Sequence, residues 1–286
     1  KSAIATVYTF YGGYYKDAVF SHFDSRTLVW SKDKGKFAEL PAQEIDEAKK
    51  RIYRTSVLTG APCVIKLPYG WGVNQESVKW IDGAPAQTLF LRDQNGLAYV
   101  QIENADGKSC ELQVEIGPTK NIFYREHDVK DSLAKDKLPY ELEKYLNEAV
   151  DANLSGVVRA RKIVSFIGSH LDYDKDNFAL EQLYKQDKSK YFLAIWENKK
   201  AKCDEANTLA ARALAKAGFA ANFISGHSVQ AKSEKGEALL LDSNRHAWLE
   251  VFDEENKKWV RMDATPKGDP NVDEEEQKED LGEGDF

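Results

Sequence analysis

Short apolar runs separated by turn-forming residues dominate the first 125 or so residues of the chain. The runs cover residues 3–10, 64–67, 87–91, 97–103 and 110–116. Groups of Asp, Asn and Gly at 93–96 and 104–107 separate the last three runs, as in strands joined by tight turns. Short strands at this spacing are typical of an antiparallel sandwich.

One helix is expected within this β-rich part. Pro41 suits the first helical position, where a backbone N–H is not needed for the helix. Ile45, Ala48 and Ile52 follow at helical spacing. We therefore predict a helix over residues 41–52.

The pattern becomes helical after Tyr124. Residues 126–140 are charged and include Pro139, which suits a linker. Beyond them, apolar residues recur at helical spacing in two stripes, first Leu142, Tyr145, Leu146 and Val150, then Val157, Ala160, Ile163, Val164 and Ile167. We therefore place a β-rich, sandwich-like accessory domain at 1–128 and a second domain, which contains these helices, at 129–267.

Composition and charge add three limits. Of the 286 residues, 42% are hydrophobic, which is enough for real cores, and no run approaches the roughly 20 apolar residues of a membrane span. Residues 268–286 hold nine acids and one base, which is a net charge of −8. The whole chain carries −7, so residues 1–267 carry a net charge of +1. Such a run is expected to be a disordered acidic tail, which could also bind a basic partner. The net negative charge disfavours nucleic acid as the main partner.

A cysteine stands at the start of the best-marked helix of the sequence. Apolar residues follow it at Ala206, Leu209, Ala210, Ala213, Leu214 and Ala217, and Gly218 stands where a helix-ending glycine is expected. Cys203 therefore lies at the helix N-terminus, where the dipole and the free N–H groups favour a thiolate. Asp204 and Glu205 oppose that charge, so a nearby cation is needed.

Residues 245–263 predict a β-hairpin that pairs a histidine with a carboxylate. A turn centred between Glu254 and Glu255 places His246 directly opposite Asp263, with both side chains on the same face. The other face is apolar, because Ala247, Leu249 and Val251 alternate with Val260, Met262 and Ala264. An imidazole–carboxylate hydrogen bond is the expected result.

Together these residues have the parts needed for thiol acyl transfer. Cys203 would attack a carbonyl, His246 would form the imidazolium partner and protonate the leaving amine, and Asp263 would orient His246. The backbone N–H of Cys203 is a natural donor to the oxyanion. Trp196, seven residues upstream, could line the acyl site or donate its indole N–H, or could simply pack in the core.

Four segments resemble the transglutaminase-like superfamily. Residues 203–207, continued through 214–221 to Ser225-Gly226-His227, are similar to its nucleophile segment. His246-Ala247-Trp248 and Trp259 to Pro266 resemble its His-Ala-Trp and Trp…Asp-x-Thr-Pro blocks, and residues 163–173 resemble the helix and Tyr-containing turn before the nucleophile. The resemblance covers residues 150–267.

This resemblance implies an α+β fold with a papain-like transglutaminase core, in which N-terminal helices and the nucleophile helix pack on an antiparallel sheet. It implies Cys203, His246 and Asp263 as the catalytic triad, with Trp196, Trp248 and His227 as candidates for substrate or oxyanion contacts. We expect a cysteine peptidase or amidase that hydrolyses peptide or amide bonds through a thioester. A protein-glutamine transamidase and a non-catalytic peptide-binding module on the same fold are the alternatives.

No cofactor is expected. A zinc site that joins Cys203, His246, Asp263 and His227 is disfavoured, because closely spaced ligand pairs are missing. Cys63 and Cys110 flank β segments of one predicted domain, so they could form a disulfide or stay as reduced core residues. The initial Lys and the cysteine count agree with export, and we expect an extracytoplasmic protein, periplasmic or secreted, with a peptide or protein substrate. The sequence does not predict an oligomeric state.

Overall fold

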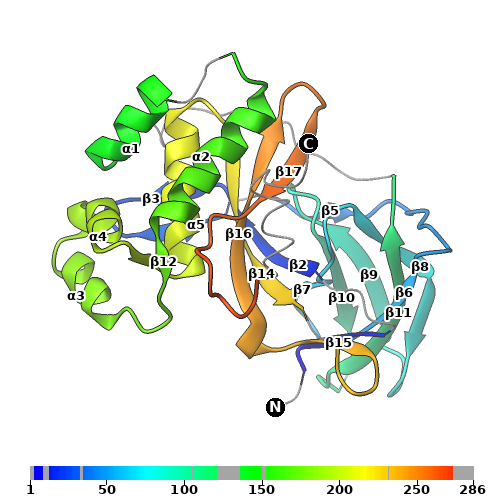
Figure 1. Ribbon diagram of the computed structural model, residues 1–286. Coiled ribbons are helices and arrows are strands. Elements are labelled where there is room, and N and C mark those ends of the chain that lie inside the picture. The colour runs from blue at the N-terminus through cyan, green and yellow to red at the C-terminus, as the bar shows by residue number, and fades with distance from the viewer. Residues whose placement is uncertain are drawn as a thin grey trace. The chain divides into compact units, whose positions relative to one another are not determined.

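The structure is a computed structural model, which describes residues 3–8, 13–32, 35–104, 106–120, 136–149, 153–230 and 232–272 (Figure 1). Helices and mainly antiparallel strands occur together, so the α+β class is confirmed. The chain forms two compact units, one of residues 1–18, 34–125 and 225–245, the other of residues 19–33, 126–224 and 246–286. None of the described helices is both long and apolar enough to cross a membrane.

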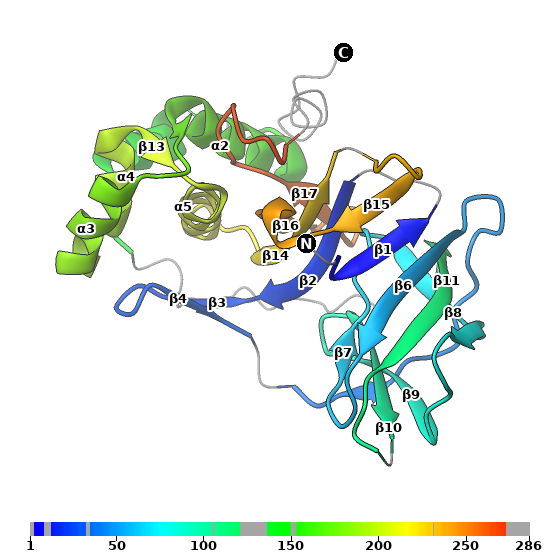
Figure 2. The same ribbon diagram turned by 90° about the horizontal axis from the view of Figure 1, so that it is seen from below.

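Two antiparallel sheets build the first unit (Figure 2). One has the strand order β15-β1-β6-β11-β8, with bounds Glu237–Leu240, Ala5–Tyr8, Arg51–Val57, Cys110–Pro118 and Trp71–Trp80. The other has the order β5-β9-β10-β7, with bounds Ala38–Glu39, Gln87–Arg92, Ala98–Glu103 and Cys63–Val64. Tyr53 and Val114 of the first sheet and Val100 and Ile102 of the second belong to one hydrophobic core. Burial of one face of each sheet is the principle of a sandwich.

The helix predicted over residues 41–52 is wrong. Ile45 forms an isolated bridge with Thr119, a turn follows in which Lys49 N–H donates to the Asp46 carbonyl at 3.1 Å, and β6 begins at Arg51. β6 pairs with β1 on one side and β11 on the other, so tertiary strand pairing overrides the short helical spacing.

The second unit contains the helices. They are α1 Tyr140–Lys144, continued by a π-helical turn Tyr145–Ala149, α2 Gly156–His170, α3 Phe178–Gln186, α4 Tyr191–Asn198, after a 3-10 turn Lys188–Lys190, and α5 Cys203–Lys216. Two short strand pairs accompany them, β3 His22–Asp24 with β4 Val29–Ser31 and β12 Asp172–Tyr173 with β13 Lys200–Ala201. The two helical stripes predicted around Leu142 and Ile163 correspond to α1 with its π-helical turn and to α2.

A four-stranded sheet lies in the order β17-β16-β14-β2. Its strands are Lys258–Met262, Arg245–Asp253, Ala221–Val229 and Gly13–Phe20. β14 and β2 each include residues that belong to the first unit and residues that belong to the second. A 3-10 turn, Asp242–Asn244, directly precedes β16.

Helix α5 is the centre of the second core, and Figure 2 views it nearly along its axis. Its predicted stripe is buried from Ala206 to Leu214, and it joins Leu249 of β16 and Met262 of β17 in one cluster. The helix ends before Gly218, whose φ of +90° favours glycine. The predicted nucleophile helix, packed on an antiparallel sheet, is therefore present.

Helix α2 approaches the end of the hairpin at a glycine. A Cβ on Gly168 would lie only 3.2 Å from the Ala264 carbonyl oxygen. Ala264 follows Asp263 directly, so this close packing fixes the backbone beside that carboxylate. A larger residue at position 168 would push the backbone away.

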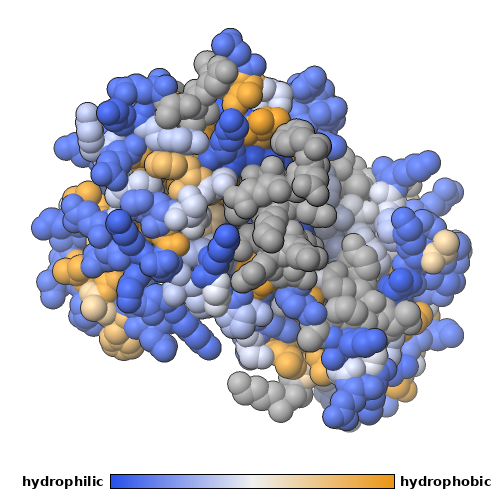
Figure 3. Space-filling view, viewed as in Figure 1, coloured by the Kyte–Doolittle hydropathy of each residue, from blue (hydrophilic) through white to orange (hydrophobic). Residues whose placement is uncertain are grey.

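Exposed apolar side chains gather on the neighbouring pair of helices α3 and α4. Phe178, Leu183 and Leu193 are all exposed, and Figure 3 shows hydrophobic surface over these helices. The opposite faces are buried through Leu180, Tyr191 and Ile195. Both helices are thus apolar on more than one side.

The compact units do not follow the predicted division at 128/129, a boundary that lies outside the described residues. Residues 19–33 belong to the second unit, where Trp30 stacks on Phe223 at 4.9 Å and its indole N–H donates to Thr208 Oγ1 at 2.9 Å. Residues 225–245 belong to the first unit, because β15 pairs with β1. Of the predicted acidic tail, residues 268–272 are described and ordered by turns, and 273–286 lie outside the described residues.

Candidate active site

Cys203 is the first residue of α5, as the apolar stripe predicted. Its side chain is half-buried. Glu205 holds the start of the helix, because its carboxylate accepts hydrogen bonds from Lys202 N–H at 2.9 Å, Asn177 Nδ2 at 2.7 Å and Tyr184 Oη at 3.0 Å. Burial raises the pKa of Glu205, although these donors offset part of the effect. Of the two acids at the start of the helix, Asp204 is exposed and Glu205 is buried.

The hairpin register differs from the predicted one. Leu249 lies opposite Met262 and Asp253 opposite Lys258, so His246 and Asp263 are not directly opposed, and that prediction is wrong by one pairing step. The cause is the loop, which has four residues instead of two. Lys257 adopts a φ of +50°, and Asp253 Oδ1 accepts the Glu255 and Asn256 N–H groups at 3.0 and 3.1 Å.

The imidazole–carboxylate bond forms nevertheless. The shift moves each residue by two positions relative to its partner, so it preserves the face of every side chain. His246 Nε2 donates to Asp263 Oδ2 at 2.7 Å, and both side chains are fully buried. Leu249, Val251 and Met262 lie in the core, which confirms the apolar face.

Charge stabilises this pair in its ionised form. Burial lowers the pKa of His246, but the Asp263 charge, its hydrogen bond and the Cys203 side chain together raise it to about 10. Burial also raises the pKa of Asp263, and the His246 charge with the hydrogen bonds from His246, Thr265 and Asn207 outweighs burial and holds it well below its usual range. His246 is therefore an imidazolium at neutral pH, and it is the cation that a thiolate at Cys203 needs.

Asn207 joins the three elements of the site; it lies in the segment 203–207 that resembles the nucleophile segment, but the sequence analysis assigned it no role of its own. Its side chain is fully buried, and Nδ2 donates to the carbonyl oxygens of Cys203 and Ala247 at 2.9 and 3.0 Å and to Asp263 Oδ1 at 3.0 Å. Its Oδ1 accepts the Ala264 N–H at 2.9 Å. The signal was a polar residue on the otherwise apolar stripe, one turn after Cys203.

Asp269 is the second residue that the sequence analysis missed. Its carboxylate is buried, and Oδ2 lies 3.6 Å from His246 Nδ1. Ligand-type atoms of Cys203, His246 and Asp269 all lie within 4.8 Å of one another. Burial raises the pKa of Asp269, which the Asn271 N–H and the His246 charge partly oppose. The acidic run concealed this residue, because its composition matched a solvated tail.

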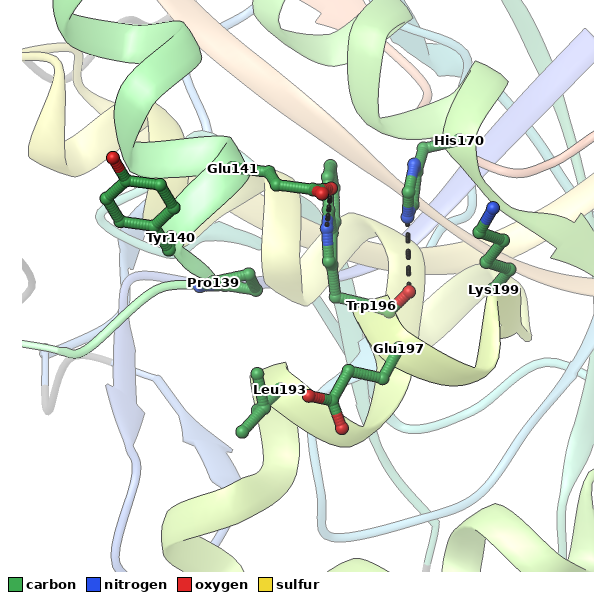
Figure 4. A pocket seen from close by; sticks show the side chains of 8 residues that line it. All are labelled: Pro139, Tyr140, Glu141, His170, Leu193, Trp196, Glu197 and Lys199. Carbon is green, nitrogen blue, oxygen red and sulfur yellow. Dashed lines mark hydrogen bonds between the residues drawn. The ribbon is translucent and has the colours of Figure 1, made fainter.

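Trp196 does not have the position expected for an oxyanion donor. Its indole N–H donates to Glu141 Oε2 at 3.1 Å, and its ring stacks on His170 with centroids 3.7 Å apart. His170 Nε2 also lies 3.1 Å from the Trp196 carbonyl oxygen (Figure 4). These residues line a cavity of about 360 Å³ with Pro139, Tyr140, Leu193, Glu197 and Lys199. The N–H is thus engaged, and Trp196 packs as part of this wall.

Trp248 and His227, the other substrate-contact candidates, are both buried. Trp248 is 1% exposed, and its ring lies 6.1 Å from that of His246 at 18°, so it supports the imidazole. His227 is 0% exposed and belongs to the first unit. Neither ring nitrogen of His227 has a hydrogen-bond partner among the described residues.

His227 should make the protein sensitive to acid. Burial, with the charges of Lys66 and Arg245 opposed by those of Asp17 and Asp242, lowers the pKa of His227 to about 4. Between pH 6.5 and 4 the unfolded chain binds a proton that the folded chain excludes, so this stabilisation is present above pH 6.5 and is lost as the pH falls. We expect about 2 kcal/mol of loss between pH 6.5 and 5.

Urea unfolding of wild type and His227→Phe at these two pH values checks this prediction. The phenylalanine variant should lose less stability than wild type, whereas the exposed His22→Gln control should match wild type. Equal pH dependence in wild type and His227→Phe would contradict it.

The disulfide considered for Cys63 and Cys110 is absent, and both are free thiols. Cys63 lies on β7 and Cys110 on β11, which belong to different sheets. Cys110 Sγ accepts from Asn104 Nδ2 at 3.5 Å, and the Cys63 thiol donates to the Ala61 carbonyl at 3.6 Å. Each sulfur therefore has its own local partner.

Comparison with known proteins adds one family match and three structural neighbours. Residues 143–264 match the family model of the transglutaminase-like superfamily, whereas no curated protein sequence matches the chain. The chain is similar to the periplasmic domain of TgpA from Pseudomonas aeruginosa, with 13% identity, coverage of 99% of this chain and 92% of that one, and a TM-score of 0.49. The same domain with ethylmercury bound is 11% identical, with coverage of 92% of this chain and 89% of that one and a TM-score of 0.46. A candidate cysteine protease from Cytophaga hutchinsonii is 10% identical, with coverage of 93% of this chain and 78% of that one and a TM-score of 0.35.

Proposed function

We propose that this chain, whose residues 143–264 carry the transglutaminase-like core that the sequence motifs predicted, is a thiol-dependent hydrolase of peptide or amide bonds. The observation that carries the proposal is the ordered series Cys203, His246 and Asp263. Cys203 begins α5, its side chain interacts with that of His246, and Asp263 holds His246 through Nε2. This is the arrangement that nucleophilic catalysis by a thiol requires.

The acylation step uses each of these groups once. The Cys203 thiolate attacks the carbonyl carbon and forms the C–S bond, and the oxyanion lies near the Cys203 N–H at the helix N-terminus. The imidazolium of His246 gives its proton to the nitrogen of the leaving amine, and the C–N bond breaks. The products are a thioester on Cys203 and the free amine.

The deacylation step regenerates the ion pair. Neutral His246 takes a proton from water, and the resulting hydroxide oxygen attacks the thioester carbonyl. The C–S bond breaks, the acid leaves, and Cys203 and His246 return to thiolate and imidazolium. Asp263 stays ionised throughout, because its Oδ1 accepts three hydrogen bonds, from Asn207 Nδ2, Thr265 N–H and Thr265 Oγ1.

Alkylation by iodoacetamide tests whether Cys203 is an activated thiol. We expect Cys203 to be labelled in the folded protein at pH 6, where an ordinary thiol with a pKa of about 8.5 is almost entirely protonated. His246→Ala should lower the labelling rate about tenfold or more, and the exposed His22→Ala should leave it unchanged. Peptide mass mapping separates Cys203 from the buried Cys110. A Cys203 that reacts only after unfolding would favour a non-catalytic binding module.

The acyl acceptor needs its own experiment. A glutamine-containing protein such as casein, supplied with a labelled primary amine, would gain label if the thioester passes to an amine. If incorporation of the labelled amine depends on Cys203, the proposed reaction would be transamidation instead of hydrolysis. Release of new amino termini from casein without label incorporation supports the hydrolase.

We also propose a substrate class and a location for this chain. A peptide or protein substrate follows from the amide chemistry that we propose. An extracytoplasmic location, periplasmic or secreted, stays a prediction.

A further inference from the structure

We propose that Cys203, His246 and Asp269 form a reversible zinc-binding site that blocks the thiol when it is occupied. Its regulatory meaning rests on the proposed function, whereas zinc binding itself does not. The site differs from the one considered from the sequence, because Asp269 replaces both Asp263 and His227.

The distances suit a tetrahedral zinc ion. Zinc binds thiolate sulfur at about 2.3 Å and histidine nitrogen or carboxylate oxygen at about 2.0–2.2 Å, so ligand atoms in a tetrahedral site are about 3.4–3.6 Å apart. Asp269 Oδ2 lies 3.6 Å from His246 Nδ1, and the three ligand-type atoms are within 4.8 Å of one another. Small side-chain movements bring all three onto one ion.

His246 is already oriented as a zinc ligand. Its Nε2 donates to Asp263 Oδ2 at 2.7 Å, which leaves Nδ1 on the side of Cys203 and Asp269. Histidines that bind metals commonly donate their other ring N–H to a carboxylate in this way, and that bond fixes the ring. The imidazole binds zinc in its neutral form, so zinc displaces one proton from Nδ1.

Asp269 presents one oxygen to the site and uses the other for its own support. Oδ1 accepts the Asn271 N–H at 2.9 Å, and the Asp269 carbonyl accepts the Val272 N–H at 3.1 Å. Oδ2 is the atom that faces His246. Asp269 is only 5% exposed, so the surrounding residues fix the position of its carboxylate beside the imidazole.

Charge and ligand type favour zinc over the common hard cations. A thiolate, a carboxylate and a neutral imidazole carry two negative charges, which one Zn²⁺ balances. Sulfur and nitrogen ligands suit zinc, whereas Mg²⁺ and Ca²⁺ prefer oxygen ligands only. Cys203 is half-exposed, so solvent has access for the ion and for a water as fourth ligand.

Zinc protection of the thiol tests the proposal in the chain of 286 residues. Metal-free protein is incubated with Zn²⁺ or Mg²⁺, labelled with iodoacetamide at pH 7, and compared with a sample to which EDTA is added. Zn²⁺ should slow labelling of Cys203 at least about tenfold, EDTA should restore it, and Mg²⁺ should have no effect. Equilibrium dialysis of Zn²⁺ measures the affinity independently of reactivity.

Asp269→Asn identifies the third ligand. Its zinc affinity should fall about tenfold or more, while Glu254→Gln, a neutralised acid at the exposed hairpin tip, should bind zinc as wild type does. Equal affinity in Asp269→Asn and wild type would overturn the assignment of Asp269.

The two proposals fail in different ways. If Cys203 is alkylated rapidly at pH 6 but zinc neither binds nor slows the reaction, the zinc site is wrong and the active thiol stands. If zinc binds through Cys203 but the metal-free thiol is inert, the proposed function fails and the zinc site stands.

Discussion

Asp263→Asn should slow acylation of Cys203 about 10⁴-fold without unfolding the protein, by analogy with the same carboxylate-to-amide change in serine proteases. The reason lies in the donors around the carboxylate. Asp263 Oδ1 accepts from Asn207 Nδ2, Thr265 N–H and Thr265 Oγ1, so the single oxygen of an asparagine must take that side. Its NH₂ group then points at His246 Nε2.

The amide NH₂ forces His246 into the wrong tautomer. An Nε2 that faces a donor must be unprotonated, so the proton sits on Nδ1, on the side of Cys203. That imidazole cannot accept the thiol proton, and the thiolate–imidazolium pair does not form. The pKa of His246 should also fall, because the Asp263 charge is among the causes that raise it.

Acylation by p-nitrophenyl acetate, followed as release of p-nitrophenol, measures the effect. Asp253→Asn is the matched control, since it lies at the other end of β16 and its side chain caps the loop, a role that asparagine also fills. Circular dichroism verifies that both variants fold. An Asp263→Asn rate within tenfold of wild type would show that the tautomer does not control the thiol.

Asn207→Ala should lower the free energy of unfolding by about 3–5 kcal/mol and also abolish most of the thiol reactivity. The change leaves the buried Ala264 N–H without its acceptor and removes the donor shared by Cys203, Ala247 and Asp263. Loss of a buried polar network is among the costliest single substitutions.

Urea denaturation measures this loss. Asn198→Ala is the control, because Asn198 is exposed and its side chain donates only one backbone bond that the structure defines, to Ala194 O at 2.8 Å, so its change should stay within about 0.5 kcal/mol. A loss below about 1 kcal/mol in Asn207→Ala would mean that other groups hold the nucleophile helix against the hairpin.

The sequence predicted the nucleophile helix well because a single amphipathic stripe records which face is buried. It predicted the face of His246 and Asp263 for the same reason, since alternation along a strand survives a shift in register. The register itself depended on the loop conformation at Lys257, which needs a left-handed backbone at a residue that is not glycine. No pattern in residues 253–258 shows that choice.

Asp269 was missed and a helix over 41–52 was wrongly predicted for a different reason. Both depend on contacts between residues far apart in the chain, His246 with Asp269 and β6 with β1 and β11. Composition assigned Asp269 to a solvated tail, and local spacing assigned 41–52 to a helix. Neither kind of local signal records a distant partner.

The exchange of segments between the two units has a consequence for folding during synthesis. The first unit needs β15, at residues 237–240, to pair with β1, and the second needs residues 246–263 to supply β16, β17 and the His246–Asp263 pair. The first core therefore cannot close before residues 237–240 have left the ribosome, and the second cannot close before residues 246–263 have. Until residue 246 has emerged, Cys203 lacks the imidazole that we propose activates it, so the nascent chain carries an ordinary, unactivated thiol.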